Sequence, residues 1–290
     1  MQKQKKAGVV ALIGRPNVGK STLLNNLLGQ KVSITSPKPQ TTRIKIQAVY
    51  EDERGQIVFV DTPGIFAKVK DSLSKKINLR AERIMAENID LILYIVDHTR
   101  YRDIEENKTL GIIRKLPVPK ILVINKIDIK KPSYKEQYAF LEDEFDHQVE
   151  ISALKRLNFN ILLDLIFAHL PQGSPIITQN SSPIPAINID SKTFLAELIR
   201  EKAFLNLRKE VPYTVNCEVE EIIERENGNL YVKGKIITTD DRYKSMIIGK
   251  GGKMIKEIGM AVRKEIEVAT GKKMYLDLTV EVNPYWIDQL

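Results

Sequence analysis

The sequence has little of what several large classes of protein require. Its 290 residues include a single cysteine, Cys217, which excludes an intrachain disulfide and a cysteine-rich zinc site and favours a reducing compartment. The longest apolar runs, such as 91–96, are far shorter than the ~20 residues that a membrane-spanning helix needs. The basic start of the chain is not followed by the small-residue cleavage site of a secretory signal. We therefore expect a cytoplasmic globular protein.

Positive charge is in excess but unevenly distributed. The formal net charge is +8, yet residues 171–290 hold equal numbers of basic and acidic residues, so the excess lies in the first 170. Within the second part, 231–273 hold 11 basic and 5 acidic residues, whereas 190–230 hold 6 and 9. A local basic block indicates a polyanionic partner better than the overall charge does, although a solvated surface can have the same composition.

Strand and helix patterns alternate along the first 170 residues. Short apolar runs such as Gly8–Ile13 are typical of strands buried on both faces of a parallel sheet. Alternation of such strands with helices predicts an α/β fold with a mostly parallel sheet and helices on both faces. The expected strands cover 8–13, 44–50, 56–60, 91–96, 120–124 and 148–151, and the expected helices 20–28, 75–88, 103–116, 134–146 and 158–170.

The pattern changes at Pro171. Residues 171–188 contain four prolines and no charge, which is typical of a linker. We therefore predict a first domain over 1–170, a linker over 171–188 and an α+β domain over 189–290. The second domain is expected to run helix, strand, strand, helix, helix, strand, over 191–207, 213–223, 230–239, 242–248, 253–269 and 273–282.

A phosphate-binding loop is predicted between the first strand and the first helix. Residues Gly14–Ser21 match the pattern G-x-x-x-x-G-K-[ST]. The glycines let backbone N–H groups point at phosphate oxygens, Lys20 offers its charge to the β- and γ-phosphates, and the Ser21 hydroxyl can bind Mg²⁺. The helix N-terminus adds its dipole. The loop alone does not distinguish adenine from guanine, or hydrolysis from kinase chemistry.

A second motif, Asp61-Thr62-Pro63-Gly64, follows a predicted strand. Asp61 lies where a carboxylate would hold Mg²⁺ through water, and the Gly64 N–H can face a γ-phosphate. Standing alone, this motif would be read as a simple Pro-Gly turn.

Two further motifs predict recognition of guanine. In Asn125-Lys126-Ile127-Asp128, the Asp128 carboxylate can accept hydrogen bonds from guanine N1–H and N2–H₂, a donor pair that adenine lacks, while Lys126 stacks along the base. Ser152-Ala153-Leu154 offers a backbone N–H to guanine O6. Each of the four motifs lies at the carboxyl end of a predicted strand, where ligands bind in α/β folds. Together they predict a GTPase.

A glycine-rich loop lies between two predicted helices of the second domain. Glycines in Ile248-Gly249-Lys250-Gly251-Gly252-Lys253 allow close approach to an RNA backbone, and Lys250 and Lys253 can pair with phosphates. In this order of elements the loop predicts a type II KH domain that clamps about four nucleotides. A helix–helix turn that is merely glycine-rich is the alternative.

These motifs resemble those of a known family. The Gly-x-Pro-Asn-Val-Gly-Lys-Ser form of the loop at 14–21 is similar to that of the translation-factor-related GTPases. With its second unit, the whole chain resembles the Era family of bacterial ribosome-assembly GTPases: a P-loop NTPase G domain followed by a KH domain. The resemblance implies that a switch segment, Gln40–Arg43, supplies Thr42 (Thr41 as second choice) to Mg²⁺.

The resemblance also implies partners. The RNA would be the 3′ region of 16S rRNA, and the chain would act, as a monomer, in assembly of the 30S subunit and maturation of its rRNA. Peripheral membrane association is implied as well, for which the sequence offers only Lys3, Lys5 and Lys6. Similarity to potassium-dependent relatives implies that Asn17 helps to bind K⁺ beside the phosphates; a role in stabilising the turn is the alternative.

Some residues depart from the pattern. Ile65 and Phe66 stand where Ras-type enzymes have a water-orienting Gln, so we expect slow intrinsic hydrolysis. Arg156 stands where the family usually has Gly, His98 after Asp97 is unusual, and the linker lacks acidic and aromatic residues.

Three other functions compete with this interpretation. A P-loop kinase is disfavoured by Asp128, and a GTPase of the large subunit or of tRNA modification by the single G domain with a KH domain. An RNA-binding module with a structural nucleotide stays open.

The candidate residues fall into four sets. Those for catalysis are Lys20, Thr42 and Gly64, and those for metal binding are Ser21, Thr42 and Asp61. Those for nucleotide binding are Gly14, Arg15, Pro16, Asn17, Val18, Gly19, Lys20, Ser21, Thr22, Asp61, Thr62, Pro63, Gly64, Asn125, Lys126, Asp128, Ser152, Ala153 and Leu154. Those for RNA binding are Ile248, Gly249, Lys250, Gly251, Gly252 and Lys253.

Overall fold

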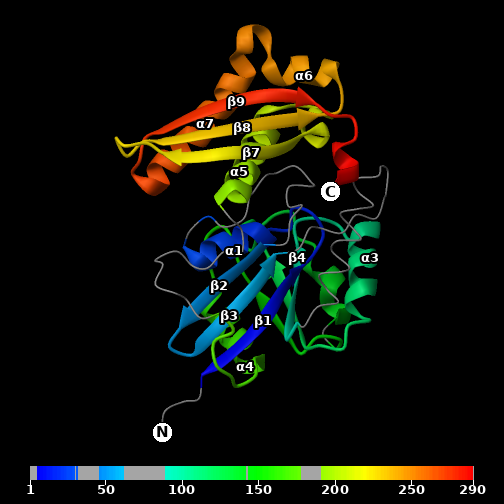
Figure 1. Cartoon of the computed structure of the whole chain (residues 1–290). Helices are drawn as coiled ribbons and strands as arrows, with labels where there is room; N and C mark the ends of the chain where they lie inside the picture. The colour runs from blue at the N-terminus through cyan, green and yellow to red at the C-terminus, as the bar shows by residue number, and fades with distance from the viewer. Residues whose placement is uncertain are drawn as a thin grey trace. The chain divides into compact units, whose positions relative to one another are not determined.

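The computed structural model divides the chain into two compact units, residues 1–188 and 189–290 (Figure 1). It describes residues 5–29, 31, 46–61, 89–141, 143–177 and 191–289. No helix within these ranges is long and apolar enough to cross a membrane.

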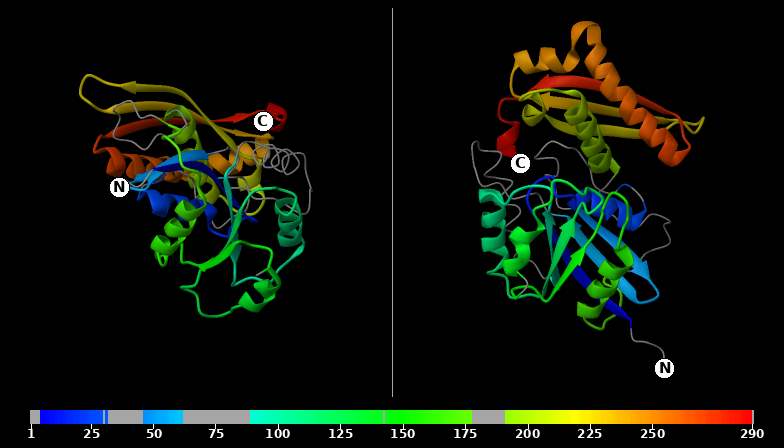
Figure 2. Two further views of the ribbon diagram at one scale, coloured as in Figure 1. Left: turned by 90° about the horizontal axis from the view of Figure 1, so that it is seen from below. Right: turned by 180° about the vertical axis from the view of Figure 1, so that it is seen from behind.

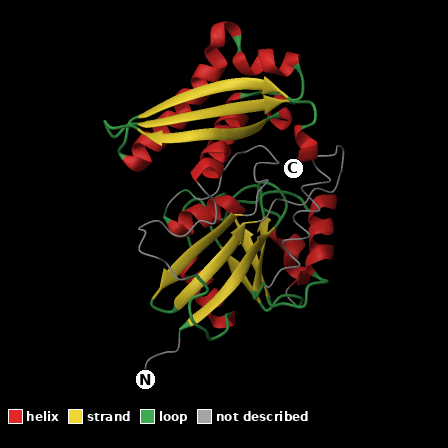
Figure 3. Cartoon of the chain, in the orientation of Figure 1, coloured by secondary structure: helices red, strands yellow, loops and turns green. Residues whose placement is uncertain are grey.

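The first unit is built on a six-stranded sheet in the order β2-β3-β1-β4-β5-β6 (Figure 3). All neighbouring strands are parallel except β2 and β3, which form an antiparallel hairpin. The mostly parallel sheet that we predicted is confirmed, because short apolar runs are stable as strands only when both of their faces are covered. The strands are β1 Lys6–Ile13, β2 Ile46–Asp52, β3 Gly55–Asp61, β4 Leu91–Asp97, β5 Lys120–Asn125 and β6 His147–Glu150.

Helices cover both faces of this sheet (Figure 2). α3 (Ile104–Ile113) and the 3₁₀ segment η1 (Lys135–Leu141) bury their apolar residues against alternate positions of β1, β4 and β5. α1 (Lys20–Leu28) and α4 (Phe159–His169) lie on the other face. This arrangement leaves the carboxyl ends of the parallel strands free for loops.

One predicted helix is wrong in type and another falls outside the described residues. We expected an α-helix over 134–146, but the structure has a 3₁₀ helix over Lys135–Leu141. Its buried residues, Tyr138 and Leu141, are three positions apart, which matches the three residues per turn of a 3₁₀ helix. The helix expected over 75–88 lies outside the described residues.

The start of the predicted linker is hydrogen-bonded to the first unit. The N–H of Ala7 donates to the carbonyl of Pro171 (3.1 Å), and Gly173 N–H donates to Lys5 (3.1 Å). The Gln56 side chain both donates to the carbonyl of Ile177 (2.8 Å) and accepts from its N–H (2.9 Å). Residues 171–177 therefore extend the first unit along β1 and β3.

The second unit has the predicted order of elements. Its sheet runs β7-β8-β9, with β7 antiparallel and β9 parallel to β8. Side chains from α5, α7 and the core face of the sheet form one apolar cluster, which includes Cys217 as expected for an inward-facing strand residue. The elements are α5 Ser191–Asn206, η2 Val211–Thr214, β7 Asn216–Glu224, β8 Leu230–Thr238, α6 Asp241–Ile248, η3 Lys250–Gly252, α7 Lys253–Thr270, β9 Met274–Val282 and η4 Trp286–Gln289.

Candidate functional site

The loop between β1 and α1 requires its glycines for close approach. A Cβ on Gly14 would lie 2.3 Å from the carbonyl oxygen of Ile95 in the neighbouring β4. Gly19 has a φ of 105°, and a Cβ there would lie 2.3 Å from Nδ2 of Asn125. A side chain at either position would therefore push the loop away from the sheet edge.

Lys20 is buried within this loop and holds its shape. The Lys20 Nζ donates to the carbonyls of Gly14 (2.9 Å) and Arg15 (3.1 Å). Burial lowers the pKa of Lys20, and the negative charges of Asp61 and Glu106 only partly oppose that shift. A buried ammonium with so little opposing charge is stabilised by an incoming anion, which is what a phosphate supplies.

Ser21 and Asp61 meet beside Lys20. The Ser21 Oγ donates to Oδ2 of Asp61 at 2.7 Å, and the Asp61 side chain is fully buried at the end of β3. A hydroxyl and a carboxylate are oxygen donors of the kind that Mg²⁺ prefers. The two predicted metal-binding residues that the structure describes are therefore brought together, and their chemistry fits the ion.

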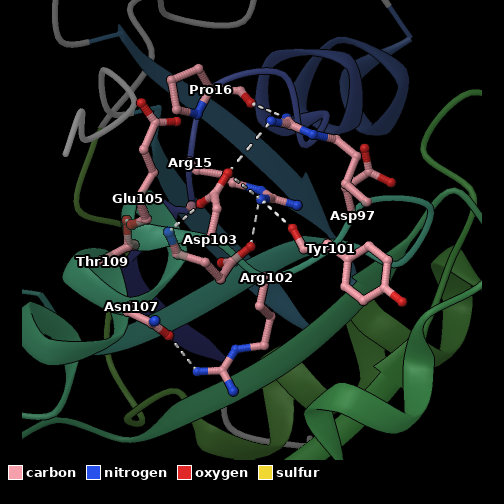
Figure 4. Close-up of polar contacts among 12 residues, drawn as sticks. Arg15, Pro16, Asp97, Tyr101, Arg102, Asp103, Glu105, Asn107 and Thr109 are labelled. Carbon is pink, nitrogen blue, oxygen red and sulfur yellow. Dashed lines mark hydrogen bonds and ion pairs between the residues drawn. The ribbon is translucent and has the colours of Figure 1, made fainter. Parts of the chain in front are cut away.

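Arg15 was predicted as a nucleotide-binding residue of this loop, and its side chain points away from the loop. It is fully buried and points toward α3, where Nη1 lies 3.0 Å from Asp103 Oδ2 and Nε lies 3.0 Å from Glu106 Oε2 (Figure 4). Nη1 also donates to the carbonyl of Tyr101 (2.9 Å). The guanidinium thus ties the loop to α3, and only the backbone of Arg15 remains to meet a phosphate.

The partner of Arg15 is itself an unusual carboxylate. Glu106 is fully buried and accepts hydrogen bonds from Tyr94 Oη (2.5 Å) and Tyr138 Oη (3.3 Å). Burial raises the pKa of Glu106, while the bond from Tyr94 and the charge of Arg15 lower it in part. Breaking such a buried pair by removing one partner costs about 3–5 kcal/mol.

One side chain, Asn125, joins three loops of the site. Its Nδ2 donates to the carbonyl of Val18 in the phosphate loop (2.7 Å). Its Oδ1 accepts from the N–H of Lys126 (2.7 Å) and from the N–H of Ala153 (2.8 Å). The amide of Asn has both donors and acceptors at this spacing, which neither Asp nor Leu of similar size has. Asn125 therefore places the phosphate loop and both base-recognition motifs relative to one another.

The remaining side chains of these two motifs are also held in place. Lys126 Nζ donates to Oδ2 of Asp97 at 2.5 Å. Burial alone would raise the pKa of Asp97, but hydrogen bonds from Lys126 and Thr99 lower it below its ordinary value. Ser152 Oγ donates to Oδ1 of Asp128 at 2.5 Å, which fixes the carboxylate that we expect to read guanine.

The loop after β6 shows why glycine suits the place of Arg156. Arg156 has a φ of 58°, in the left-handed region that favours glycine, so the loop keeps this conformation with a side chain present. Asn26 of α1 supports the same loop by donating from Nδ2 to the carbonyl of Ala153 (2.6 Å). We did not predict Asn26, because only the folded chain brings residues 26 and 153 together.

The other nucleotide-site candidates are divided between described and undescribed residues. Val18 is buried, Pro16 accepts from Arg100 Nη1 at 3.2 Å, Asn17 has a φ of 66°, Thr22 lies in the first turn of α1, and Leu154 is largely exposed. Thr41, Thr42, Thr62, Pro63, Gly64, Ile65 and Phe66 lie outside the described residues.

The loop between α6 and α7 is shaped by three glycines with positive φ. Gly249 has φ 73° and ψ 170°, and a Cβ there would lie 2.8 Å from Cβ of Met254. Gly251 (φ 60°) and Gly252 (φ 76°) instead face open space. Lys250 and Lys253 are exposed, whereas Ile248 packs in part against the apolar core. The loop therefore offers an accessible backbone flanked by two cations.

Comparisons with known proteins match the two units in the same order. A family model described as 50S ribosome-binding GTPase matches residues 9–126, and one described as KH domain matches residues 210–287. The GTPase Era of Halothermothrix orenii is 42% identical over 284 residues, which is 97% of this chain and 94% of that protein. The chain belongs to the Era family of GTPases. The GTPase Era of Trichlorobacter lovleyi is also 42% identical, over 98% of this chain and 95% of its own length.

Solved Era structures are similar over both units. A variant of Era from Aquifex aeolicus bound to GDP and aluminium fluoride has a TM-score of 0.88 at 39% identity, covering 97% of this chain and 95% of its own. Era in complex with MgGDPNP and nucleotides 1506–1542 of 16S ribosomal RNA has the same score and identity, covering 98% and 95%. As a member of the Era family, the chain is a GTPase with a G domain followed by a KH domain.

Proposed function

We propose that the chain is a GTP-dependent switch that binds the 3′ region of 16S rRNA through its KH domain and acts in 30S subunit assembly and rRNA maturation. The observation that carries the proposal is the contact of Asn125 with Val18, Lys126 and Ala153, which gathers the nucleotide motifs in one site. The same chain also carries the exposed glycine loop of a KH domain. The Era structure that holds both MgGDPNP and 16S RNA supports the pairing of the two ligands.

In the proposed site each motif has a separate task. Backbone N–H groups of residues 14–22 and the Lys20 ammonium bind the phosphates, and Gly64 N–H meets the γ-phosphate. Asp128 accepts from guanine N1–H and N2–H₂, Lys126 stacks along the base, and residues 152–154 supply a donor to O6. Lys20 thereby stabilises negative charge that develops on the phosphates during hydrolysis.

Ser21 and Asp61 are the described residues that would hold Mg²⁺, with Thr42 as the proposed third protein group. When bound, the ion neutralises charge on the β- and γ-phosphates. Binding of GTP is proposed to order the segment around Thr42 and the residues after Gly64, which is a common way for γ-phosphate to act as a switch.

Hydrolysis is proposed to be slow and to depend on K⁺. Neither Ile65 nor Phe66 can orient a water molecule, and Asn17 lies in the loop where a monovalent cation could supply charge. In single-turnover assays we expect a low rate in Na⁺ and a higher rate in K⁺, and the Asn17→Ala variant should lose that difference. Equal rates in the two salts would remove the K⁺ site, and a fast rate in Na⁺ would contradict slow intrinsic chemistry.

Selectivity for guanine tests the proposal most simply. The unsubstituted chain should bind GDP at least ~100-fold more tightly than ADP, because adenine leaves the Asp128 carboxylate without its two donors. Asp128→Asn should lose most of this ratio, since an amide cannot accept two hydrogen bonds from the same edge. Ser133→Ala, a change outside these motifs, serves as the control. Isothermal titration of both nucleotides gives the ratio, and equal affinities for GDP and ADP would overturn the proposal.

The large ribosomal subunit is the second candidate for the site of action. It is favoured by the description of the family model that matches residues 9–126. That model covers the G domain alone, whereas the Era structure with 16S RNA covers 98% of this chain. Crosslinking to RNA followed by sequencing separates the two, and we expect the crosslinks in the small-subunit RNA.

The remaining expectations concern boundaries and location. We propose a G domain over 1–170, extended by residues 171–177 of the linker, and a KH domain over 189–290. We propose a monomer in the cytoplasm whose membrane contact is peripheral and made by Lys3 and Lys5. Lys6 is engaged elsewhere, because its Nζ donates to the carbonyls of Phe167 (2.6 Å) and Ala168 (3.0 Å) at the end of α4.

A further inference from the structure

A buried histidine, His98, contacts the guanine motif at residues 125–128. His98 follows β4 and is only 2% exposed. Its Nδ1 lies 3.1 Å from Ser133 Oγ, and its Nε2 lies 3.0 Å from the carbonyl oxygen of Lys126. A carbonyl can only accept a hydrogen bond, so Nε2 carries a hydrogen and donates to Lys126. In the neutral ring, Nδ1 then accepts from the Ser133 hydroxyl.

The carbonyl that His98 binds belongs to a residue in an uncommon conformation. Lys126 has a φ of 71°, in the left-handed region. Its carbonyl accepts a second hydrogen bond, from the N–H of Ile129 (2.9 Å), and its own N–H donates to Asn125 Oδ1. Left-handed conformations of residues other than glycine persist only where the surroundings hold them. His98 supplies one of the contacts that hold Lys126.

Residues 97 and 98, at the end of β4, contact both ends of the segment 126–134, which contains Asp128. The carbonyl of His98 accepts from the N–H of Tyr134 (2.7 Å), and the neighbouring Asp97 accepts from Lys126 Nζ. Residues 97–98 thus hold the segment at Lys126 and again at residues 133–134. Asp128 lies between these attachment points, so its direction depends on them.

We propose that His98 is a positioning residue for guanine specificity: by donating from Nε2 to the Lys126 carbonyl, it fixes the turn that directs the Asp128 carboxylate at guanine N1–H and N2–H₂. His98 acts through Lys126 rather than on the nucleotide. The inference rests on the proposed role of Asp128 in reading the base.

Two amide substitutions separate the two contacts of the ring. In His98→Gln the longer side chain places an N–H donor where Nε2 lies, and so keeps the bond to Lys126. In His98→Asn the shorter amide reaches only the position of Nδ1 and keeps the bond to Ser133. His98→Met fills the buried space without any hydrogen-bond donor. It replaces His98→Asn as the variant without a donor to Lys126 if His98→Asn does not fold. Ser133→Ala removes the contact on the other side of the ring.

The ratio of GDP to IDP affinity reports how well the Asp128 carboxylate is oriented toward the 2-amino group of guanine. Inosine lacks the 2-amino group, so this ratio measures the hydrogen bond between Asp128 and N2–H₂ and is insensitive to a uniform loss of folded protein. We expect His98→Asn and His98→Met to weaken GDP about tenfold and to lower the ratio at least about threefold. His98→Gln and Ser133→Ala should keep the ratio of the unsubstituted chain. Urea unfolding of each variant gives its stability separately.

The outcomes distinguish this inference from the proposed function. Asp128→Asn must lower the GDP to IDP ratio; if it does not, base reading by Asp128 is wrong. If Asp128→Asn lowers the ratio but His98→Asn and His98→Met weaken GDP and IDP equally, His98 is structural only and the inference is overturned. The inference is also overturned if the GDP to IDP ratio falls as much in His98→Gln as in His98→Asn, because the donor to Lys126 would then be irrelevant.

Discussion

At the scale of single residues, the nucleotide site concentrates backbone conformations that side chains disfavour. Five residues other than glycine have a positive φ in the described part of the chain, and four of them, Asn17, Lys126, Arg156 and Asn158, lie in the loops of this site. Each such conformation costs about 1–2 kcal/mol. The contacts of Asn125, Asp97 and His98 all fall on Lys126 and hold its left-handed conformation.

Arg156 offers a direct measurement of that strain. Its side chain is exposed and its φ is 58°. Arg156→Gly should therefore raise the free energy of unfolding by about 0.5–1 kcal/mol. This gain is the energy released by relieving the left-handed conformation, minus the entropy that glycine adds to the unfolded chain. Arg156→Ala is the matched control, because it removes the same side chain but keeps the Cβ and should give no gain. Urea denaturation measures both. A loss of stability in Arg156→Gly would show that the side chain itself stabilises the loop.

The sequence did not reveal contacts between residues that lie far apart along the chain, even where it marked a residue such as His98 as unusual. The phosphate loop and the guanine motif were predicted because their chemistry lies in a continuous run of letters. Asn26, His98 and the burial of the Arg15 guanidinium each depend on a partner that is far away along the chain. Nothing in the residues around position 15 indicates that the Arg15 guanidinium pairs with Glu106, because the two lie 91 positions apart along the chain.

At the scale of elements, the parallel sheet explains why four separate motifs form one site. β1, β3, β4, β5 and β6 are mutually parallel, so the loops that follow them leave from the same edge. The order of strands and helices along the chain and most helix bounds were predictable, since buried strands and amphipathic helices have distinct periods. The order of the strands across the sheet was not predicted. The 3₁₀ segment η1 was not, because its two buried residues also fit a helix of 3.6 residues per turn.

The glycine loop between α6 and α7 gives the prediction for the second unit. Lys253 lies at the first turn of α7 beside the open backbone of Gly251 and Gly252, whereas Lys264 is exposed farther along the same helix. Lys253→Glu should lower affinity for a 16S 3′-end RNA fragment about tenfold and reduce its salt dependence, and Lys264→Glu should change affinity less than about twofold. Filter binding at several salt concentrations measures both. Equal losses in the two variants would mean that RNA binding follows general charge rather than the loop.

At the scale of the whole molecule, the two units have separate cores and separate chemistry. The G domain has buried charged residues around its nucleotide site, and the KH domain has a continuous apolar core of its own. The division at residues 188 and 189 and the match of a different family model to each unit support two folding units. A switch requires that the nucleotide bound in one unit changes the affinity of the other for RNA, and that coupling is a free energy that can be measured.

The most direct test uses the Asp128→Asn variant, in which the substitution should change the base specificity from guanine to xanthine. Xanthine carries a carbonyl in place of the guanine 2-amino group, so the amide of Asp128→Asn can donate to it and should bind xanthosine nucleotides in place of guanosine ones. The measurement is the affinity of Asp128→Asn for a 16S 3′-end RNA fragment, with triphosphate analogues and diphosphates of both bases. The account predicts that RNA affinity differs between the xanthosine triphosphate analogue and the diphosphate, and does not respond to the guanosine pair. RNA affinity that is the same in all four states, or that still follows the guanosine pair, would contradict the account.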